Sequence, residues 1–275
     1  MFKTTIRGNE TKYAPEFESK DIFQYSKFNH LENLLIDNTL GFSSLYDFND
    51  PFETAYNLTY YFKSLIDRNI YLNELNGKNG SKTELVDKIK DIIKNELSKI
   101  SITCFSKTPY EPLMWAHYSE KHTGICYCFD KSSIFDREKF HYKDLQYSSE
   151  LPTINFYELK TTLEILKHQI ENIIFTKSTN WIYEKELRFY IESTEKTFKF
   201  NPKSLNAVII GYRVTDHSKI KKLVDNFNLI NKTDVIILYA KPGITDYKMN
   251  ISNNKPSNGS AMGIPFYNYN EKPII

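Results

Sequence analysis

The stretch ISITCFSKTPYEPLMWAHYSEKHTGICYCFD, residues 100–130, decides how we expect the rest of the chain to be arranged. Its first residues are β-branched and aromatic, which predicts a short strand. Proline breaks the strand, and Pro112 suits the first turn of a helix. Thr123-Gly124 ends that helix before a second apolar run. The predicted order is a strand (100–105), a loop, a short helix (113–119) and a strand (125–129).

The predicted helix and its exit carry an unusual density of polar and aromatic side chains. Trp115, His117, Tyr118, Lys121 and His122 all fall within this short segment. Helical spacing places Met114, His117 and Tyr118 on one face. One interpretation is that the aromatic residues pack and the histidines are solvated, since short helices between core strands often carry amphipathic aromatics. The other is that the segment lines a site.

The composition of the chain bounds its class. It has 275 residues, 40% hydrophobic and 25% charged, and this is typical of a globular protein with a substantial core. The formal net charge of +2 argues neither for nor against a nucleic-acid partner. The sequence has no apolar run of the roughly 18 residues that span a bilayer, and it begins without the apolar segment of a secretory signal. We therefore expect a cytoplasmic protein without membrane contact.

Three cysteines, Cys104, Cys126 and Cys128, are expected to be buried free thiols. Cys126 and Cys128 are too close along one strand for an ordinary disulfide. The sequence contains no C-x-x-C pair and no Cys/His spacing typical of a metal site. We expect no metal cofactor and a reducing compartment.

Taken in order, the chain predicts one α+β domain with a mixed or antiparallel core sheet flanked by helices. Residues 1–20 form a polar arm, 21–250 the domain, and 251–275 an irregular tail. Asn29 is the expected N-cap of a helix over 30–37. Strands are expected at 21–28, 39–45, 139–147, 181–192, 197–200, 207–211, 235–240 and 246–250. Helices are expected at 54–66 and 82–98, which form an insertion over about 54–98, and at 152–175 and 214–227, the last with a Thr215/Asp216 cap.

A second informative stretch is KSTNWIYEKELR, residues 177–188. If it is a strand, Glu184, Glu186 and Arg188 alternate and share one face. Two carboxylates so placed repel each other, and the arginine would relieve that repulsion. A solvated strand face is the alternative. The ordered charges and the preceding Trp181 and Tyr183 favour a site.

Other candidates receive the plainer interpretation. Asp50 and Glu53 lie in a turn-rich loop (46–53), and we expect them to cap the start of a helix. The basic segment DHSKIKKL (216–223) is expected to be a solvated helix face. The sequence contains neither a phosphate-binding loop, nor a dinucleotide glycine fingerprint, nor a G-x-S-x-G elbow.

Several motifs together resemble a bacterial family known only as a domain of unknown function, which overlaps in pattern with the AbiG-type abortive-infection proteins of phage defence. The resemblance runs from about Tyr25 to Gly211. The motifs are FNDPFE (48–53), CFS (104–106), MW-x-HY (114–118), H-x-G (122–124), F-D (129–130) and W-x-YE-x-E-x-R (181–188).

The layout is also similar, more distantly, to that of ADP-ribosyltransferases. A strand, a helix with NLL (33–35), the strand TLGFSS (39–44), a strand ending in Ser106 and a Glu-x-Glu segment follow in order. The resemblance implies NAD as substrate, with Tyr25 or Lys27 holding it and Ser106 supporting the nicotinamide pocket. It implies that Glu186 is catalytic and that Glu184 contacts the acceptor. The remaining residues expected to line the pocket are Trp115, His117, Tyr118 and Arg188.

Three hypotheses follow. The first is an NAD-dependent ADP-ribosyltransferase-like enzyme, a toxin or phage-defence effector acting on a protein, nucleic-acid or other acceptor. The second is a metal-independent nuclease-type toxin in which His117 and His122 act as acid and base, with Lys121 and Arg188 on the phosphate. The third is a non-catalytic sensor or antitoxin module that binds a nucleotide-type small molecule or a partner. The usual first-strand Arg or His of the transferases is absent, which favours this third hypothesis.

Overall fold

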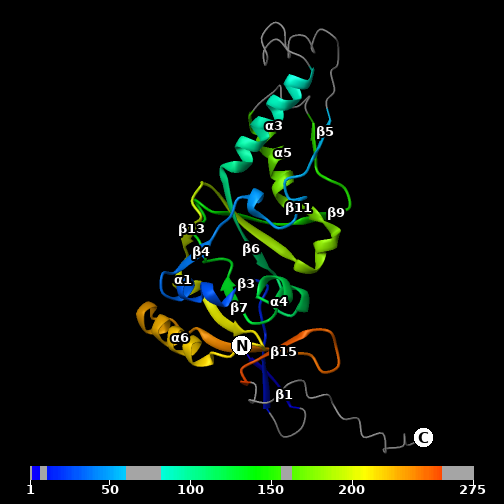
Figure 1. The fold of residues 1–275 in the computed structure, drawn as a ribbon. Helices are drawn as coiled ribbons and strands as arrows, with labels where there is room; N and C mark the ends of the chain where they lie inside the picture. The colour runs from blue at the N-terminus through cyan, green and yellow to red at the C-terminus, as the bar shows by residue number, and fades with distance from the viewer. Residues whose placement is uncertain (1, 7–10, 60–81, 156–162, 256–275) are drawn as a thin grey trace, which may run out of the picture. The chain divides into compact units, whose positions relative to one another are not determined.

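The computed structural model describes residues 2–6, 11–59, 82–155 and 163–255 and has the α+β class with a mixed sheet flanked by helices, as predicted. Its strands and helices are drawn in Figure 1. The chain divides into two compact units. The first comprises Met1–Ile36, Thr108–Ser132 and Pro202–Ile275, and the second comprises Asp37–Lys107 and Ser133–Asn201.

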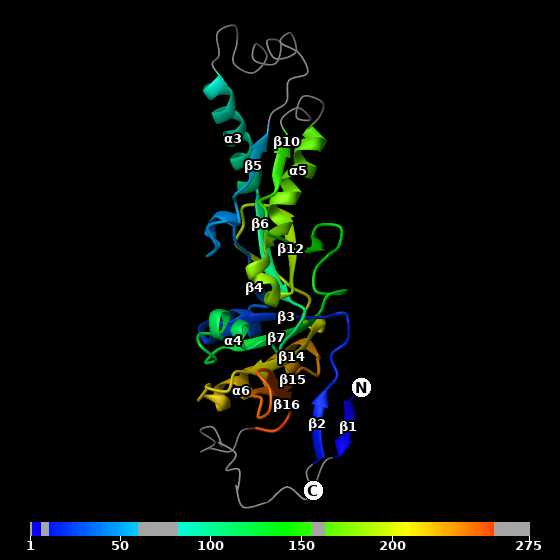
Figure 2. The same cartoon turned by 90° about the vertical axis from the view of Figure 1, so that its right-hand side faces the viewer.

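Five strands of the first unit lie side by side in the order β16-β15-β14-β7-β3 (Figure 2). Only β14 and β15 are parallel, and α6 connects them; the other neighbours are antiparallel. The strands are β3 (Asp21–Ser26), β7 (Ile125–Asp130), β14 (Leu205–Ile210), β15 (Ile236–Pro242) and β16 (Met249–Ser252).

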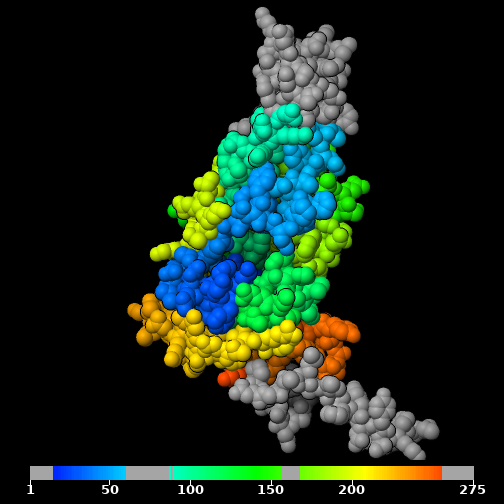
Figure 3. Space-filling model, viewed as in Figure 1, coloured from blue at the N-terminus to red at the C-terminus, as the bar shows by residue number. Residues whose placement is uncertain are grey.

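The helices of the first unit are short except for α6. Asp216 caps the N-terminus of α6 by accepting a hydrogen bond from the Lys219 N–H, as the sequence predicts. The helix buries one apolar stripe and leaves its other side on the surface of the molecule, where it is coloured orange in Figure 3. The elements are α1 (Leu31–Leu35) after the 3-10 turn Phe28–His30, α4 (Pro112–Tyr118), the 3-10 turn Pro202–Ser204 and α6 (His217–Asn231).

Alternation along β7 builds the core of the first unit. Cys126 and Cys128 point to one face, where they pack with Trp115 from α4. Tyr127 and Phe129, both fully buried, point to the other face. Because every β7 side chain but the last is buried, β7 is a central strand, and this accounts for the apolar run ICYCF. All three cysteines are free, as predicted.

The second unit contains the strands β6 (Ile100–Ser106), β12 (Glu186–Glu192) and β8 (His141–Asp144), in the order β6-β12-β8 and antiparallel. Its long helices are α3 (Lys82–Ser98) and α5 (Leu163–Phe175). The unit also contains three short two-stranded pairs. These are β13 (Thr197–Lys199) with β4 (Thr39–Gly41), β10 (Thr153–Asn155) with β5 (Asn57–Thr59), and β11 (Thr176–Ser178) with β9 (Gln146–Ser148).

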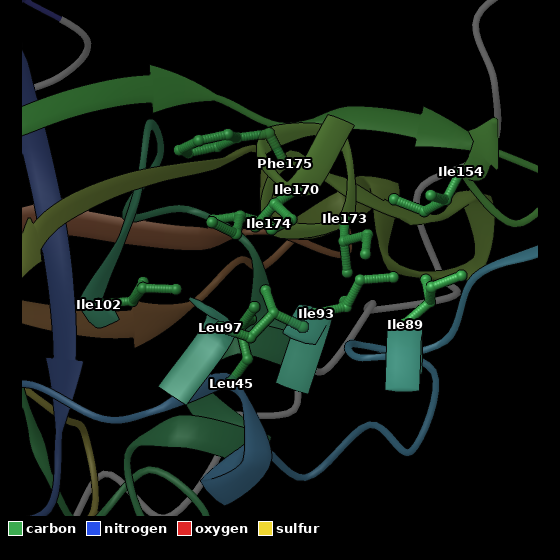
Figure 4. Close-up of a cluster of buried hydrophobic side chains, with 10 residues drawn as sticks. All are labelled: Leu45, Ile89, Ile93, Leu97, Ile102, Ile154, Ile170, Ile173, Ile174 and Phe175. Carbon is green, nitrogen blue, oxygen red and sulfur yellow. The ribbon is translucent and has the colours of Figure 1, made fainter. Parts of the chain in front are cut away.

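The core of this unit joins α3, α5 and β6. Ile93 and Leu97 of α3 face Ile170 and Ile174 of α5, and Ile102 of β6 completes the cluster (Figure 4). These side chains are at most a few per cent exposed. Burying each of them stabilises the fold by about 1.5–3 kcal/mol. The apolar spacing of α3 and the apolar run of α5 are what direct both helices onto β6.

Several predicted elements are wrong in type or extent. The helix expected at 54–66 is absent from its described part, where irregular chain over 54–56 leads into the strand β5; residues 60–66 lie outside the described residues. The helix expected from Pro152 is preceded by the strand β10, because Thr153–Asn155 pairs with β5. The strand expected over 139–147 is two strands, β8 and β9. His30 and not Asn29 precedes α1, without a side-chain cap.

The N-terminal arm and the 181–192 segment also differ. Within residues 1–20, β1 (Phe2–Ile6) and β2 (Thr11–Pro15) pair as antiparallel strands, which the polar composition did not indicate. Residues 179–184 form a 3-10 helix instead of the start of a strand, and β12 begins only at Glu186. Glu184 is therefore not on the strand that carries Glu186.

Candidate functional site

Five charged side chains of the second unit form a buried cluster, which we call the charge cluster. Lys177 Nζ lies 2.6 Å from Glu184 Oε2, 2.9 Å from Glu186 Oε2 and 3.2 Å from Glu53 Oε1. All five side chains, including that of Arg188, are at most 5% exposed. Three carboxylates face two cations, so the cluster carries a formal charge of −1.

Arg188 is the second centre of the charge cluster. Its Nε donates to Glu186 Oε1 at 2.6 Å, its Nη2 to Glu53 Oε2 at 2.7 Å and its Nη1 to the carbonyl of Ile174 at 2.6 Å. The planar guanidinium thus uses three separate nitrogens on three acceptors, a geometry that lysine cannot reproduce. The guanidinium carbon, Cζ, lies over the Phe48 ring, 5.1 Å from the ring centre. Arg188 therefore fixes the positions of Glu53 and Glu186 relative to one another.

Local backbone geometry explains how Glu184 and Glu186 meet on one lysine. Lys185, between them, is in the left-handed region with φ 46°, which reverses the chain as the 3-10 helix ends and β12 begins. Ser106 stabilises this turn by donating its hydroxyl to the Glu184 carbonyl at 2.6 Å. The two carboxylates therefore converge through a turn and not through the alternation of a strand.

The charges of the cluster stabilise one another's ionised forms. Burial alone would raise the pKa of Glu186, but Arg188 and Lys177 outweigh it and lower that pKa to about 2. Burial would lower the pKa of Lys177, but Glu186, Glu53 and Glu184 raise it well above its usual value. The pKa of Arg188 is raised in the same way, chiefly by Glu186 against the effect of burial. The pairs that Glu186 forms with Lys177 and Arg188 are consequently between charged groups at neutral pH.

Two further polar groups surround Glu186. Its backbone N–H donates to the hydroxyl of Tyr147 at 2.9 Å, and burial raises the pKa of Tyr147 to about 12. Cys104 lies directly across the sheet from Arg188 on β6. Burial and the neighbouring Glu186 raise the pKa of the Cys104 thiol well above its usual value. Cys104 therefore stays protonated beside the cluster.

A cavity of about 290 Å³ adjoins the charge cluster in the second unit. Three buried charged residues, Asp50, Glu53 and Lys177, line it, and Glu53 is the most buried of them. The aromatic ring at its wall belongs to Phe52, which is 61% exposed. The polar residues that complete the lining are Asp50, Ser148, Ser149, Glu150, Thr176, Ser178 and Asn180.

Glu53 and Lys177 are the two members of the charge cluster that the sequence analysis did not place in a site. No helix begins at residues 50–53, so the expected cap is wrong there. Asp50 instead accepts a hydrogen bond from the Phe52 N–H at 3.0 Å within a turn, and Glu53 is buried in the cluster. In the segment FNDPFE, Glu53 directly follows the apolar Phe52 and has no basic residue nearby in the sequence with which to pair. This pattern could have indicated that Glu53 is buried.

The other predicted site residues lie in the first unit. Trp115 is fully buried; its indole N–H donates to the Pro109 carbonyl at 2.8 Å, and its ring meets that of Tyr25 edge-on at 5.2 Å. The Tyr25 hydroxyl donates to the Thr108 carbonyl at 2.8 Å. These two residues form one packed pair.

The remaining first-unit candidates are nearer the surface. Lys27 and His117 are exposed, and Tyr118, half-buried, has its ring 6.2 Å from that of His117. His122 lies against Tyr212 at 5.0 Å, and burial, followed by the charge of Arg213, lowers the pKa of His122. The two histidines thus contact different aromatic partners.

Comparison with known proteins gives one family. The family described as "Protein of unknown function (DUF2971)" matches residues 114–189. This region contains the MW-x-HY, H-x-G and W-x-YE-x-E-x-R segments, whereas FNDPFE and CFS precede it. No curated protein and no solved structure matches the chain.

No group of three or more His, Cys, Asp or Glu side chains suited to a metal ion is found in the described part of the chain. Among the same residues, no helix has both the length and the apolar character needed to cross a bilayer.

Proposed function

We propose that the cavity beside the charge cluster binds the nicotinamide-riboside part of NAD and that the chain is an ADP-ribosyltransferase-like enzyme. The observation that carries this proposal is the charge of the cavity. Three carboxylates, those of Asp50, Glu53 and Glu150, line it against the single ammonium group of Lys177. An acidic cavity with an aromatic wall favours a cationic ring that bears hydroxyl groups.

The nicotinamide ring of NAD is a pyridinium cation, and its ribose offers hydroxyl donors. The exposed Phe52 ring provides a face on which a cationic ring can stack, a contact worth about 0.5–2 kcal/mol. Carboxylate and serine oxygens accept hydrogen bonds from ribose. A cavity of about 290 Å³ lies at the lower end of ligand-pocket sizes, so it suits one part of a dinucleotide and not the whole. The phosphates would then lie outside the acidic lining.

The chemistry needs a carboxylate that stays ionised near the ribose. Breaking the nicotinamide–ribose C–N bond develops positive charge on the ribose, which a fixed carboxylate stabilises. Nicotinamide leaves with the bonding electron pair, and the acceptor or water forms the new bond to ribose while losing a proton. Any carboxylate that performs this role must remain charged at neutral pH.

We assign the ligand-facing position to Glu53. Its Oε1 lies 3.2 Å from Lys177 Nζ but has no hydrogen-bond partner within the described residues, so it retains acceptor capacity. Both oxygens of Glu186 already accept hydrogen bonds, from Arg188 and Lys177. In this proposal Glu186 and Glu184 position Lys177, and Arg188 positions Glu53.

A second candidate, binding of the same ligand without turnover, is favoured by one observation. The side chains of Glu53 and Glu186 are only 1% and 5% exposed. A ligand in the cavity then contacts the lining without reaching a reactive carboxylate, as expected of a sensor or antitoxin module. Turnover of NAD distinguishes the two.

The test is nicotinamide release from NAD by the purified chain, measured by chromatography, beside Glu53→Gln and Glu186→Gln variants. We expect release by the wild type and a loss of at least a hundredfold in Glu53→Gln. The matched control is Glu138→Gln, which removes an exposed carboxylate of the same unit that does not line the cavity. Release that is unchanged in Glu53→Gln would contradict the assignment.

Binding is tested separately by thermal shift, because a ligand that binds only the folded chain raises its melting temperature. We expect NAD and nicotinamide riboside to raise it, and ADP-ribose, which lacks the pyridinium, to raise it less. Binding without nicotinamide release would support the sensor or antitoxin candidate. The absence of both would contradict the proposal. A chain that consumes NAD would also deplete it in the producing cell, the behaviour required of a toxin or phage-defence effector.

A further inference from the structure

A second and larger cavity lies in the same unit, with a volume of about 490 Å³. Four isoleucines form its apolar lining: Ile100, Ile170, Ile174 and Ile191. Ile170 and Ile174 also belong to the core cluster of Figure 4, so this lining is the outer surface of that core. The volume is in the range of pockets that hold a small organic ligand.

Three carboxylates, two ammonium groups and two rings also line the cavity, and of the carboxylates Glu192 is exposed. Glu171 is half-buried and forms no ion pair with a basic residue in the described part of the chain, whereas Glu96, on the same cavity, is paired with Lys99. The rings of Tyr190 and His141 lie 5.5 Å apart at the wall. An unpaired carboxylate beside aromatic faces is the arrangement that recognises an ammonium group.

We propose that this cavity binds a hydrophobic amine. Its ammonium group would pair with Glu171 and lie against the rings of Tyr190 and His141, while its apolar body covers the half-buried Ile100 and Ile191. Removing the exposed parts of Ile100 and Ile191 from water contributes to the affinity, and Glu171 supplies the preference for a cation. The site is separate from the cavity at the charge cluster and does not depend on the function proposed there.

The test uses a matched pair of fluorescent probes, dansylcadaverine, which ends in a primary amine, and dansyl-ε-aminocaproate, which ends in a carboxylate. We expect the amine to bind saturably with a blue shift, and the acid to bind at least tenfold more weakly. Glu171→Gln should weaken amine binding about tenfold and leave the binding of the acid unchanged or stronger. Lys139→Gln, which removes a cation from the rim of the same cavity, should leave amine binding unchanged or stronger.

Ile191→Trp tests the location. Ile191 is half-buried at the cavity and not part of the closed core, so an indole there fills the space without emptying the core. We expect this variant to melt as the wild type does and to lose amine binding. Equal affinity for the two probes, no binding of the amine, or amine binding that survives Ile191→Trp in a folded protein would each overturn the proposal.

Discussion

Arg188 and Glu53 are 135 positions apart in the chain, yet the Nη2 of the arginine lies 2.7 Å from the Oε2 of the glutamate, and both side chains are at most 1% exposed. The pair joins the turn at residues 50–53 to β12. A carboxylate so buried is stable as an anion only where a cation meets it. The loop sequence FNDPFE is therefore held in place by charge.

Removing that cation is expected to be severely destabilising. Arg188→Met keeps most of the side-chain volume but removes one of the two cations that Glu53 and Glu186 share and leaves the Ile174 carbonyl without this donor. Breaking a buried ion pair from one side costs about 3–5 kcal/mol. Urea denaturation monitored by circular dichroism should show this loss in the free energy of unfolding.

The control is an exposed ion pair of the same unit. Lys196 Nζ lies 3.1 Å from Asp47 Oδ2, with the lysine side chain 73% exposed. Lys196→Met should cost less than about 1 kcal/mol. Equal losses in the two variants would show that the charge cluster does not stabilise the second unit as the geometry indicates.

Acid should destabilise the protein through Glu186. Its usual pKa of 4.5 is lowered to about 2 in the folded chain, since Arg188 and Lys177 outweigh the effect of burial. A lowered folded-state pKa stabilises the fold at every pH above the unfolded value, and this contribution is lost as pH falls from about 4.5 to about 2. The free energy of unfolding should therefore fall across this window.

Glu186→Gln should flatten that fall, because a glutamine does not titrate. The comparison is made by urea denaturation at a series of pH values from neutral to the acid limit of folding. Glu138→Gln, an exposed carboxylate of the same unit, should keep the wild-type slope. If Glu186→Gln and wild type lose stability in parallel, the carboxylate is not ionised in the fold as described.

Part of the charge cluster could be predicted from the sequence and part could not. Alternation in EKELR predicted that Glu186 and Arg188 share a face, because a period of two follows from strand geometry alone. Glu184 joins the cluster for a different reason, the left-handed Lys185, and a non-glycine residue with positive φ is uncommon enough that no local pattern indicates it. Glu53 and Lys177 reach the cluster only through tertiary packing.

The same distinction applies to the fold. The sequence predicted the long helix at 82–98, and apolar runs predicted the buried strands β7 and β14. The pairing of β10 with β5 overrode the helical interpretation of both segments, because a short polar run such as TIN or NLT takes its conformation from its partner strand. The Asp50–Pro51 turn was expected, but nothing local showed that Glu53 turns inward from it.

Cys104 should react faster with alkylating agents when Glu186 is neutralised. Burial raises the pKa of the thiol first, and the charge and hydrogen bond of Glu186 raise it further. Replacing Glu186 with Gln removes the second contribution and increases the thiolate fraction, about tenfold for each unit by which the pKa falls. Iodoacetamide labelling followed by mass spectrometry of the Cys104 peptide measures this rate.

Cys126 and Cys128 serve as internal controls in the same labelling experiment. Both lie in the first unit, and burial is the main cause that raises the pKa of each thiol. Their labelling rates should be the same in wild type and Glu186→Gln. A general acceleration of all three would indicate unfolding, and an unchanged Cys104 rate would mean that Glu186 does not act on the thiol.

Two glycines provide a last prediction, in which the same substitution should have opposite effects. A Cβ at Gly124 would lie 2.2 Å from the Ser26 carbonyl oxygen and 3.0 Å from the backbone of Ser119, so backbone must shift. Gly124→Ala should therefore destabilise the protein by about 1–3 kcal/mol, the usual cost of overpacking.

A Cβ at Gly41 meets nothing within 4 Å. Gly41→Ala should be neutral or stabilise by up to about 1 kcal/mol, because alanine reduces the entropy of the unfolded chain. Thermal and urea denaturation of both variants measure the difference, and a Gly124→Ala protein as stable as wild type would mean that the chain after α4 does not approach β3 as closely as described.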